Sequence, residues 1–356
     1  MINYGAAPPA DEVELIVFGP GYGESIAVHV GDNNWLLVDS CFDAAKKRPA
    51  SLDYLERIGV SFDRVKVIVA THWHDDHVKG LAEIVKCCTS ATLQVSSVFN
   101  DREALAFLSA YGGATAAVHT RGAKELHEAI RSSNDAAYAS QRTILWEDTI
   151  QGRKMRAVAF SPTPQAVVQF IARVSSFLPD NPDPINHAPE LKPNLETVVI
   201  SIDLGSDGIL LGSDLENHDE HGWSAVIGNE WCLTKNQKAS AYKVSHHGSA
   251  TGDHPRIWGD LLLMDPMSVL TPFMNGSVKL PKDTDRSRIV ANSAQAYISS
   301  NGTMKSKLNP SLLKQMGQVG SNIVPLEGGF GAVRFRKKLG AQKWNVELFG
   351  QAQEMK

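Results

Sequence analysis

The densest group of side chains able to do chemistry is the run Thr71-His72-Trp73-His74-Asp75-Asp76-His77. Imidazole and carboxylate groups are good ligands for zinc and neighbouring metals. A turn after a strand can point alternate side chains at one spot and the next residues at a spot beside it. The spacing therefore predicts a two-metal site, with His72 and His74 on one ion and Asp76 and His77 on the other. Three histidines and two acids within six positions argue against a chance polar turn.

Two later segments supply further candidate ligands, each after an apolar run. Asp214 follows Gly208–Gly212, and its carboxylate could place one oxygen on each of two ions. Taken alone, Asp214 would more often be a turn or helix-capping residue. His246 and His247 follow Ala241–Val244, either as one ligand with one contact behind it or to substrate, or as incidental histidines of a surface loop. We expect His246 to be the ligand, because it directly ends the strand.

The elements that must position these groups are short strands. Val65–Ala70 is a continuous apolar run, typical of a strand buried on both faces, and Val78 to about Cys88 is expected to be helical. Thr197–Leu204 and Gly208–Gly212 read as a hairpin. Near the end of the chain, Ala296–Ser299 and Ala332–Phe335 are expected to be edge strands. No internal repeat and no linker divides the chain.

The stretch between the first and second candidate ligand segments reads as an insertion. Residues 100–147 are rich in alanine and expected to be mostly helical, whereas Ser161–Pro193 is rich in proline and polar residues and expected to be an irregular loop. Function concentrates in long loops over a rigid scaffold. Residues 100–193 are therefore the expected place for a lid over the site.

Composition excludes several classes of protein. With 35 Lys and Arg against 39 Asp and Glu, the net charge of −4 rules out a globally basic nucleic-acid coat but leaves room for a local basic groove. There is no run of about 18 apolar residues and no secretory signal, so no membrane partner is expected. Four scattered cysteines fit a reduced compartment. We expect a cytoplasmic protein, and the oligomeric state stays open.

Together these segments resemble the metallo-β-lactamase-fold superfamily of metal-dependent hydrolases. The resemblance rests, in chain order, on Val38-Asp39, the His72–His77 run, Gly212-Ser213-Asp214 and Lys243-Val244-Ser245-His246-His247-Gly248-Ser249. The last segment, with Gly19-Pro20-Gly21-Tyr22-Gly23-Glu24-Ser25, resembles the branch that contains the soluble domain of DNA-uptake competence channels and phosphorylcholine esterases.

The resemblance implies an α/β fold, a four-layer αββα sandwich with the metal site at one edge. Residues 11–280 would form the hydrolase domain, and residues 281–356 a C-terminal extension packed on it. Asp214 would bridge two divalent ions, most simply zinc, with manganese or iron as alternatives. Asp39 would support the site by hydrogen bonding behind the ligands.

One departure from the family pattern concerns the first ion. Many members carry a further metal-binding histidine where this chain reads Pro193-Asn194-Leu195-Glu196-Thr197. His187, on the preceding irregular stretch, is a possible extra ligand. We therefore expect the ion at His72 and His74 to bind more weakly than the ion at Asp76 and His77.

The expected function is hydrolysis by a metal-bound hydroxide, with Asp76, Asp214 and His246 as the catalytic residues. Lys243 and Ser249 could bind a substrate phosphate or simply be solvated at the end of the strand, and His247 could contact substrate or support the ligands. The leading expectation is a phosphodiester substrate, either a nucleic acid or a nucleotide or other small molecule. One alternative is hydrolysis of a carboxylic ester, thioester or lactam on the same metals. Another is a catalytically weak binding or regulatory module of the same fold. An iron-dependent oxidoreductase or sulfur dioxygenase is a less favoured option.

Overall fold

The computed structural model describes residues 2–19, 23–43, 47–100, 121–175, 193–219, 221–234, 236–275, 277–300 and 329–356. His187 and parts of the expected 100–193 insertion lie outside these ranges. Among the described helices, none is long and apolar enough to cross a membrane.

The first sheet has eight strands in the order β19-β18-β1-β2-β3-β6-β7-β8. Their bounds are β1 Glu12–Gly19, β2 Ser25–His29, β3 Trp35–Val38, β6 Val65–Ala70, β7 Thr92–Ser96, β8 Ala136–Ala139, β18 Gly331–Lys338 and β19 Asn345–Gly350. Strands β3, β6, β7 and β8 run parallel, so their carboxyl ends lie at one edge. The apolar run of β6 is buried along nearly its whole length, as its sequence predicts.

The second sheet repeats this plan, in the order β20-β17-β14-β13-β12-β11-β10-β9. Its strands are β9 Ile144–Ile150, β10 Arg153–Ala159, β11 Ile200–Asp203, β12 Gly208–Leu211, β13 Ala239–Lys243, β14 Leu262–Leu270, β17 Gln295–Ile298 and β20 Gln353–Glu354. Strands β12, β13, β14 and β17 are parallel. The expected hairpin is β11 and β12, which pair antiparallel.

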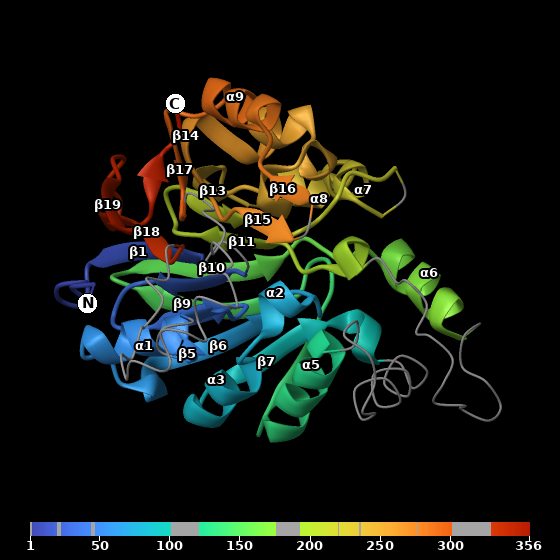
Figure 1. The fold of residues 1–356 in the computed structure, drawn as a ribbon, viewed down its shortest axis with the longest axis horizontal. Coiled ribbons are helices and arrows are strands. Elements are labelled where there is room, and N and C mark those ends of the chain that lie inside the picture. Colours follow the sequence, from blue (N-terminus) through green and yellow to red (C-terminus); the bar gives the residue numbers. More distant parts are fainter. Residues whose placement is uncertain are drawn as a thin grey trace, which may run out of the picture.

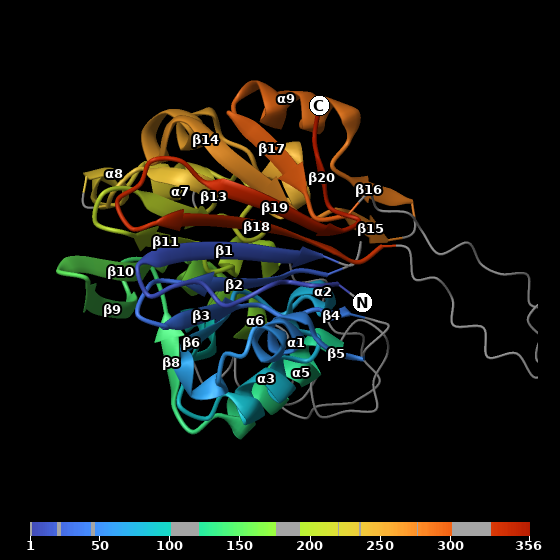
Figure 2. The same ribbon diagram turned by 90° about the vertical axis from the view of Figure 1, so that its left-hand side faces the viewer.

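Helices cover the outer face of each sheet (Figures 1 and 2). The first sheet is covered by α1 Ala50–Arg57, α3 Leu81–Cys87 and α5 Arg121–Ser132, and the second by α7 Trp223–Ile227, α8 Glu230–Thr234 and α9 Asp283–Ala291. Between the sheets, side chains such as Val17, Val69, Ile209 and Val269 form a separate apolar core. The expected four-layer αββα sandwich is confirmed.

The 100–193 stretch contains more regular structure than its composition suggests. In the described part of the segment predicted to be helical, residues 121–147, helix α5 is followed by β8 and the start of β9, so the prediction of mostly helix is wrong for these residues. Alanine favours helices, but pairing with β7 overrides this preference in β8. The expected loop contains helix α6 (Pro164–Ser175), whose Ala166, Phe170 and Val174 are buried at helical spacing.

The C-terminal strands are internal rather than edge strands. Strand β18 lies between β1 and β19, and β17 lies between β14 and β20. Phe335 and Val333 of β18 enter the core between the sheets. The C-terminal segment therefore completes both sheets as well as packing on them, because its apolar strands bury more surface inside a sheet than at an edge.

Deletion of residues 329–356 should abolish cooperative folding. It would remove β18, β19 and β20, strip β1 of one neighbour along its whole length, and open the inter-sheet core at Phe335. Thermal unfolding followed by circular dichroism measures this. Deletion of residues 353–356, which removes only β20, is the control and should shift the midpoint slightly. A sharp transition in the longer deletion would contradict this role of β18.

Candidate metal centre

Loops that follow parallel strands of both sheets meet at one edge of the sandwich. Asp39 follows β3 and the His72–His77 run follows β6 in the first sheet, whereas Asp214 follows β12 and His247 follows β13 in the second. Open α/β sheets place their sites at the carboxyl ends of parallel strands. The site thus needs both sheets, and each supplies about half of its side chains.

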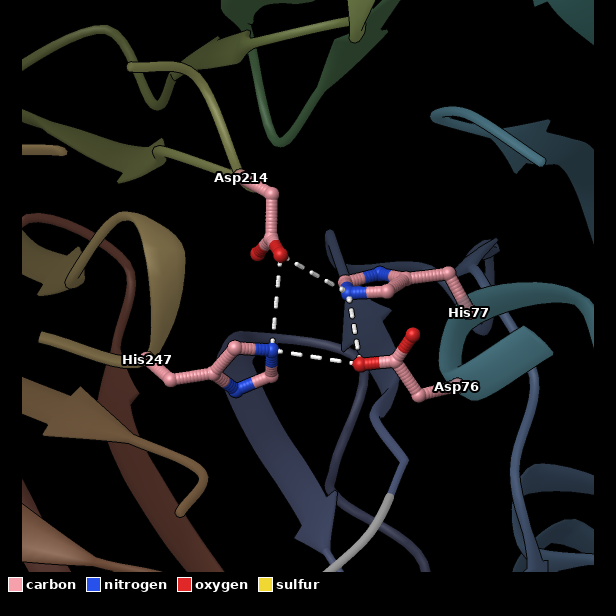
Figure 3. Close-up of side chains that lie close together, drawn as sticks. All are labelled: Asp76, His77, Asp214 and His247. Carbon is pink, nitrogen blue, oxygen red and sulfur yellow. Dashed lines mark ion pairs between the residues drawn. The ribbon is translucent and has the colours of Figure 1, made fainter. Parts of the chain in front are cut away.

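Four buried side chains converge there: Asp76, His77, Asp214 and His247 (Figure 3). Asp76 and His77 come from α2 (Asp75–Val78), which begins directly after the turn. The His247 Nε2 lies 3.3 Å from Asp76 Oδ2 and 3.4 Å from Asp214 Oδ2. The His77 Nε2 lies 3.4 Å from Asp214 Oδ2 and 3.7 Å from Asp76 Oδ2.

These distances fit a cation held among the four groups. A tetrahedral zinc ion with bonds of about 2.0–2.1 Å holds its ligand atoms about 3.3–3.4 Å apart. Within the described part of the chain, the buried Nε2 atoms of His77 and His247 make no regular hydrogen bond and only face the carboxylates of Asp76 and Asp214, and the Oδ1 of Asp214 also has no hydrogen-bond partner there. Buried polar atoms are costly unless something satisfies them. A divalent cation supplies the missing interaction, so the residues present fit a metal site.

A second donor set shares Asp214 and consists of His72, His74 and Asp214. The His72 Nε2 and His74 Nδ1 lie 3.1 Å apart. His72 is buried and His74 is partly exposed, so this set lies on the more open side. Two adjacent donor sets with one shared carboxylate match the arrangement predicted for two ions. That these residues act as ligands stays a prediction.

Asp39 lies behind His77, where the resemblance placed it. Its Oδ2 is 2.7 Å from His77 Nδ1 and also accepts from the Thr71 hydroxyl at 2.7 Å, while Oδ1 accepts from the Thr71 backbone N–H at 2.8 Å. An ionised carboxylate only accepts, so His77 carries its proton on Nδ1. The Nε2 lone pair is then directed at Asp76 and Asp214, as a metal ligand requires.

His247 is oriented in the same way by the second sheet. Its Nδ1 lies 3.1 Å from the Thr271 carbonyl oxygen and 3.0 Å from the Thr271 hydroxyl. A carbonyl oxygen can only accept, so Nδ1 is the protonated nitrogen of the neutral ring and Nε2 faces the cluster. Thr271 directly follows β14 and was not among the residues predicted from sequence.

The structure places His247, not His246, in the cluster, which corrects the expectation that His246 is the ligand. Both residues have left-handed backbone, with φ of 47° and 51°, so the chain does not continue the strand beyond Ser245. His246 instead contacts residues outside the cluster: its Nδ1 is 2.8 Å from the Thr251 hydroxyl and its Nε2 is 3.3 Å from Asn194 Nδ2.

The other residues predicted to contact substrate lie in different settings. Lys243 is fully buried and its ammonium lies 2.7 Å from Glu24 Oε1, so it is not available to a substrate phosphate. Ser249 is half-buried, and its hydroxyl accepts from the Thr251 backbone N–H at 3.3 Å. Asn194, at the position of the absent family histidine, donates to Glu216 at 2.9 Å.

Close backbone approach explains two glycines near the cluster. A side chain on Gly212 would place its Cβ 2.1 Å from the Ser245 hydroxyl, and one on Gly122 would place it 1.9 Å from the Trp73 carbonyl oxygen. The glycine in Gly212-Ser213-Asp214 therefore lets the Asp214 and His247 loops touch. Ser213 and Asp39 also have positive φ, of 45° and 56°. Such strain is typical of functional sites.

The cluster also shifts the pKa values of its members. Burial alone would lower the pKa of the His77 imidazole, but Asp214, Asp76 and Asp39 outweigh it and raise that pKa well above its usual value. Burial likewise opposes the positive charge on His247, yet Asp214 and Asp76 raise its pKa to about 9. In contrast, burial lowers the pKa of His72 well below its usual value, with His77 and His74 adding to the effect.

Replacing His246 and His247 one at a time should show which of the two binds a metal ion. His247→Ala should lose at least one bound zinc ion per chain, because its Nε2 lies in the buried cluster. His246→Ala should keep its full metal content, because the ring points toward Thr251. Elemental analysis of purified protein after equilibration with Zn²⁺ measures both. The reverse pattern would restore His246 as the ligand.

Metal binding should release at least one proton and strengthen with pH. With its pKa at about 9, His247 is protonated at pH 7 in the metal-free protein, and a cation must displace that proton. Zn²⁺ affinity should rise between pH 7 and 9 by about tenfold per pH unit for each proton released. His77 also has a raised pKa and can release a second proton. Titration calorimetry in buffers of different ionisation enthalpy counts the protons. An affinity independent of pH over this range would contradict the assignment.

The raised pKa of His247 makes the metal-free protein less stable as the pH rises, whereas it makes Zn²⁺ binding stronger. A raised pKa stabilises the folded state below the ordinary value of 6.5, and this contribution is lost as the pH rises through about 9.

A family model matches the part of the chain that carries the first group of candidate ligands. Residues 18–86 match the profile of the Metallo-beta-lactamase superfamily. This segment contains Asp39 and the whole His72–His77 run. A search of curated protein sequences found no match.

Similar solved structures are found at low sequence identity. The metallo-beta-lactamase fold protein YhfI from Bacillus subtilis is 12% identical, with 81% of this chain and 95% of that chain covered and a TM-score of 0.42. Zinc-bound PqqB from Methylobacterium extorquens is 13% identical, with 61% and 55% covered and a TM-score of 0.31. The resemblance seen in the sequence motifs is confirmed by the profile match: residues 18–86 carry the signature of the metallo-beta-lactamase superfamily.

Proposed function

We propose that this protein is a metal-dependent hydrolase that binds two divalent cations, zinc in the first instance, and cleaves phosphodiesters. The observation that carries the proposal is the pair of donor sets that share Asp214, one with Asp76, His77 and His247 and the other with His72 and His74. Paired cations beside each other are typical of enzymes that hydrolyse phosphate esters. The superfamily match supports a hydrolase in general.

The residues of the chain hold and orient the reacting groups. When bound, divalent ions lower the pKa of water and polarise a phosphoryl oxygen. Asp214 faces both donor sets, and Asp76 lies within 3.3 Å of His247 Nε2, so both carboxylates border the reacting position. Asp39 and Thr271 keep the two imidazoles fixed, which removes the need for reorganisation during the reaction.

Polar groups on the more open side are placed to contact the substrate. The His246 and Glu216 side chains are 19% and 30% exposed, and Asn194 contacts both. His246 also lies near His74, the partly exposed member of the second donor set. We infer that His246 and Asn194 orient the substrate by hydrogen bonds. Ser249, one turn further on, stays a candidate for the same role.

The two ions should differ in affinity. Four side chains face one position but only three face the other, because no additional His, Cys, Asp or Glu among the described residues joins His72, His74 and Asp214. Mild chelation should remove one ion first and leave a protein with a single ion.

Hydrolysis assays test the proposed function. Protein loaded with Zn²⁺, Mn²⁺ or Fe²⁺ should cleave bis(p-nitrophenyl) phosphate faster than p-nitrophenyl acetate, and Asp214→Asn should abolish turnover because it removes the charge of the shared carboxylate. Faster cleavage of the acetate would favour the carboxylic ester alternative. Full metal content without turnover of either compound would favour a binding module.

His246→Ala should reduce kcat/KM by about tenfold to hundredfold, the effect of losing one hydrogen bond to the transition state. Metal content should not change, since His246 lies outside both donor sets. His254→Ala is the matched control: it removes another histidine of the same region, whose Nδ1 accepts from the Arg256 backbone N–H. Equal activity of wild-type protein and His246→Ala would remove His246 from the substrate contacts.

A further inference from the structure

Glu24 is a buried acid that the mechanism does not use. It lies in the first sheet, directly before β2, and its side chain is 1% exposed. Its position ends the Gly19–Glu24 segment, a motif to which the proposed function assigns no role. Three contacts of Glu24 reach the surroundings of the predicted metal ligands: one at Asp76 itself, and two at Thr271 and Lys243, which contact His247 and the Asp214 loop.

The first contact is made by the backbone. The Glu24 N–H donates to the carbonyl oxygen of Asp76 at 2.8 Å, which fixes the start of α2. The second is made by the carboxylate, whose Oε2 accepts from the Thr271 hydroxyl at 2.6 Å. Because that hydroxyl donates to Glu24, its lone pairs are free to accept from His247 Nδ1 at 3.0 Å. Glu24 therefore supports the orientation of His247.

The third contact is the ion pair with Lys243, whose Nζ lies 2.7 Å from Glu24 Oε1. Lys243 is fully buried at the end of β13 and also donates to the Ser213 carbonyl oxygen at 3.1 Å. The next carboxylate oxygen is Oδ1 of Asp214, at 3.9 Å. In the described part of the chain, the nearest other carboxylate to this buried ammonium is thus the one shared by the two donor sets.

We propose that Glu24 is a positioning residue that ties the ligand-bearing loops of both sheets together and holds the Lys243 ammonium away from Asp214. The inference rests on the metal centre of the proposed function. Glu24 connects the Asp76 loop of the first sheet to the Asp214 and His247 loops of the second. Without its charge, Lys243 would turn to Asp214 and compete with the cation for that ligand.

If this inference holds, the Glu24→Gln variant should bind Zn²⁺ more weakly than the wild-type protein. The variant keeps the shape of the side chain but leaves the Lys243 ammonium without its carboxylate. The site becomes more positive by one charge, and Lys243 is drawn to Asp214, so both effects weaken cation binding. Zn²⁺ affinity, measured by competition with a chromophoric chelator, should fall about tenfold to hundredfold, the usual range for residues that orient metal ligands.

The double variant Glu24→Gln/Lys243→Met separates this role from a loss of packing. Removal of both charges leaves no ammonium to compete for Asp214, so Zn²⁺ affinity should recover above that of Glu24→Gln. A residue that serves only packing would give a double variant at least as weak as the single one. That result, or an unchanged affinity in Glu24→Gln, would overturn the proposal.

The buried pair Lys337 and Asp207 provides a matched control. Asp207 contacts Lys337 and Ser240 and lies before β12, whereas Asp214 follows the same strand at its other end. Asp207→Asn also deprives a buried lysine of its carboxylate, so it should lower the unfolding temperature. Its Zn²⁺ affinity should equal that of wild-type protein. A loss as large as that of Glu24→Gln would show a general effect of destabilisation and overturn the proposal.

Thr271 supplies a test that leaves both charges in place, should Glu24→Gln fail to fold. Thr271→Val breaks the hydroxyl link from Glu24 to His247 and should weaken Zn²⁺ binding, whereas Thr271→Ser keeps the link and should restore it. Equal affinities of the two variants would count against the role of Glu24. Because the readout is Zn²⁺ binding, absence of hydrolysis contradicts only the proposed function, while wild-type protein that binds no Zn²⁺ overturns both proposals.

Discussion

Four buried carboxylates at one edge of the sandwich impose the constraint on which the rest of the structure depends. Glu24, Asp39, Asp76 and Asp214 are each at most 6% exposed. Buried charges of one sign are costly unless each is paired. Lys243 pairs with Glu24, and the imidazoles of His77 and His247 face the other three. The positive partners are therefore as much a requirement of folding as of chemistry.

Because these charged groups come from both sheets, the stability of the folded protein would depend on cation binding. Asp39 and Asp76 belong to the first sheet, whereas Asp214, Lys243 and His247 belong to the second. A ligand that binds only the folded state stabilises it by a free energy that grows with the logarithm of its concentration divided by its dissociation constant. A cation among these groups would therefore hold the two sheets together at the edge where the parallel strands end, opposite the turns that carry Asp207.

The parts of the site that could be predicted are those whose residues lie close together in the sequence or directly after an apolar strand. The His72–His77 run and Asp214 each follow an apolar strand directly, so strand direction alone brings them to one edge. The choice between His246 and His247 could not be made, because it depends on two left-handed residues in succession, which few sequences signal outside glycine and asparagine. Glu24 and Thr271 were missed because their contact joins positions 247 residues apart.

The fold shows the same division between local and long-range information. The four layers follow from the family motifs and the buried strands, whereas β8 and β9 were hidden by composition that favours helices. Helix α6 was hidden by the prolines around it, although its buried residues repeat every four positions. The local sequence of β17 and β18 does not show whether they are internal or edge strands, because that depends on partner strands far away in the chain.

The raised pKa values of His77 and His247 explain how such a site can fold before it binds a cation. Protonated imidazoles place positive charge among Asp39, Asp76 and Asp214, as a divalent ion would. Cation binding at this site would then exchange protons for metal within a preformed cage. Asp39 and Thr271 hold the rings in the same orientation in both states, because the nitrogen they contact is protonated in the imidazolium and in the metal-ready ring alike. The ligands are thereby oriented by contacts that do not depend on the metal.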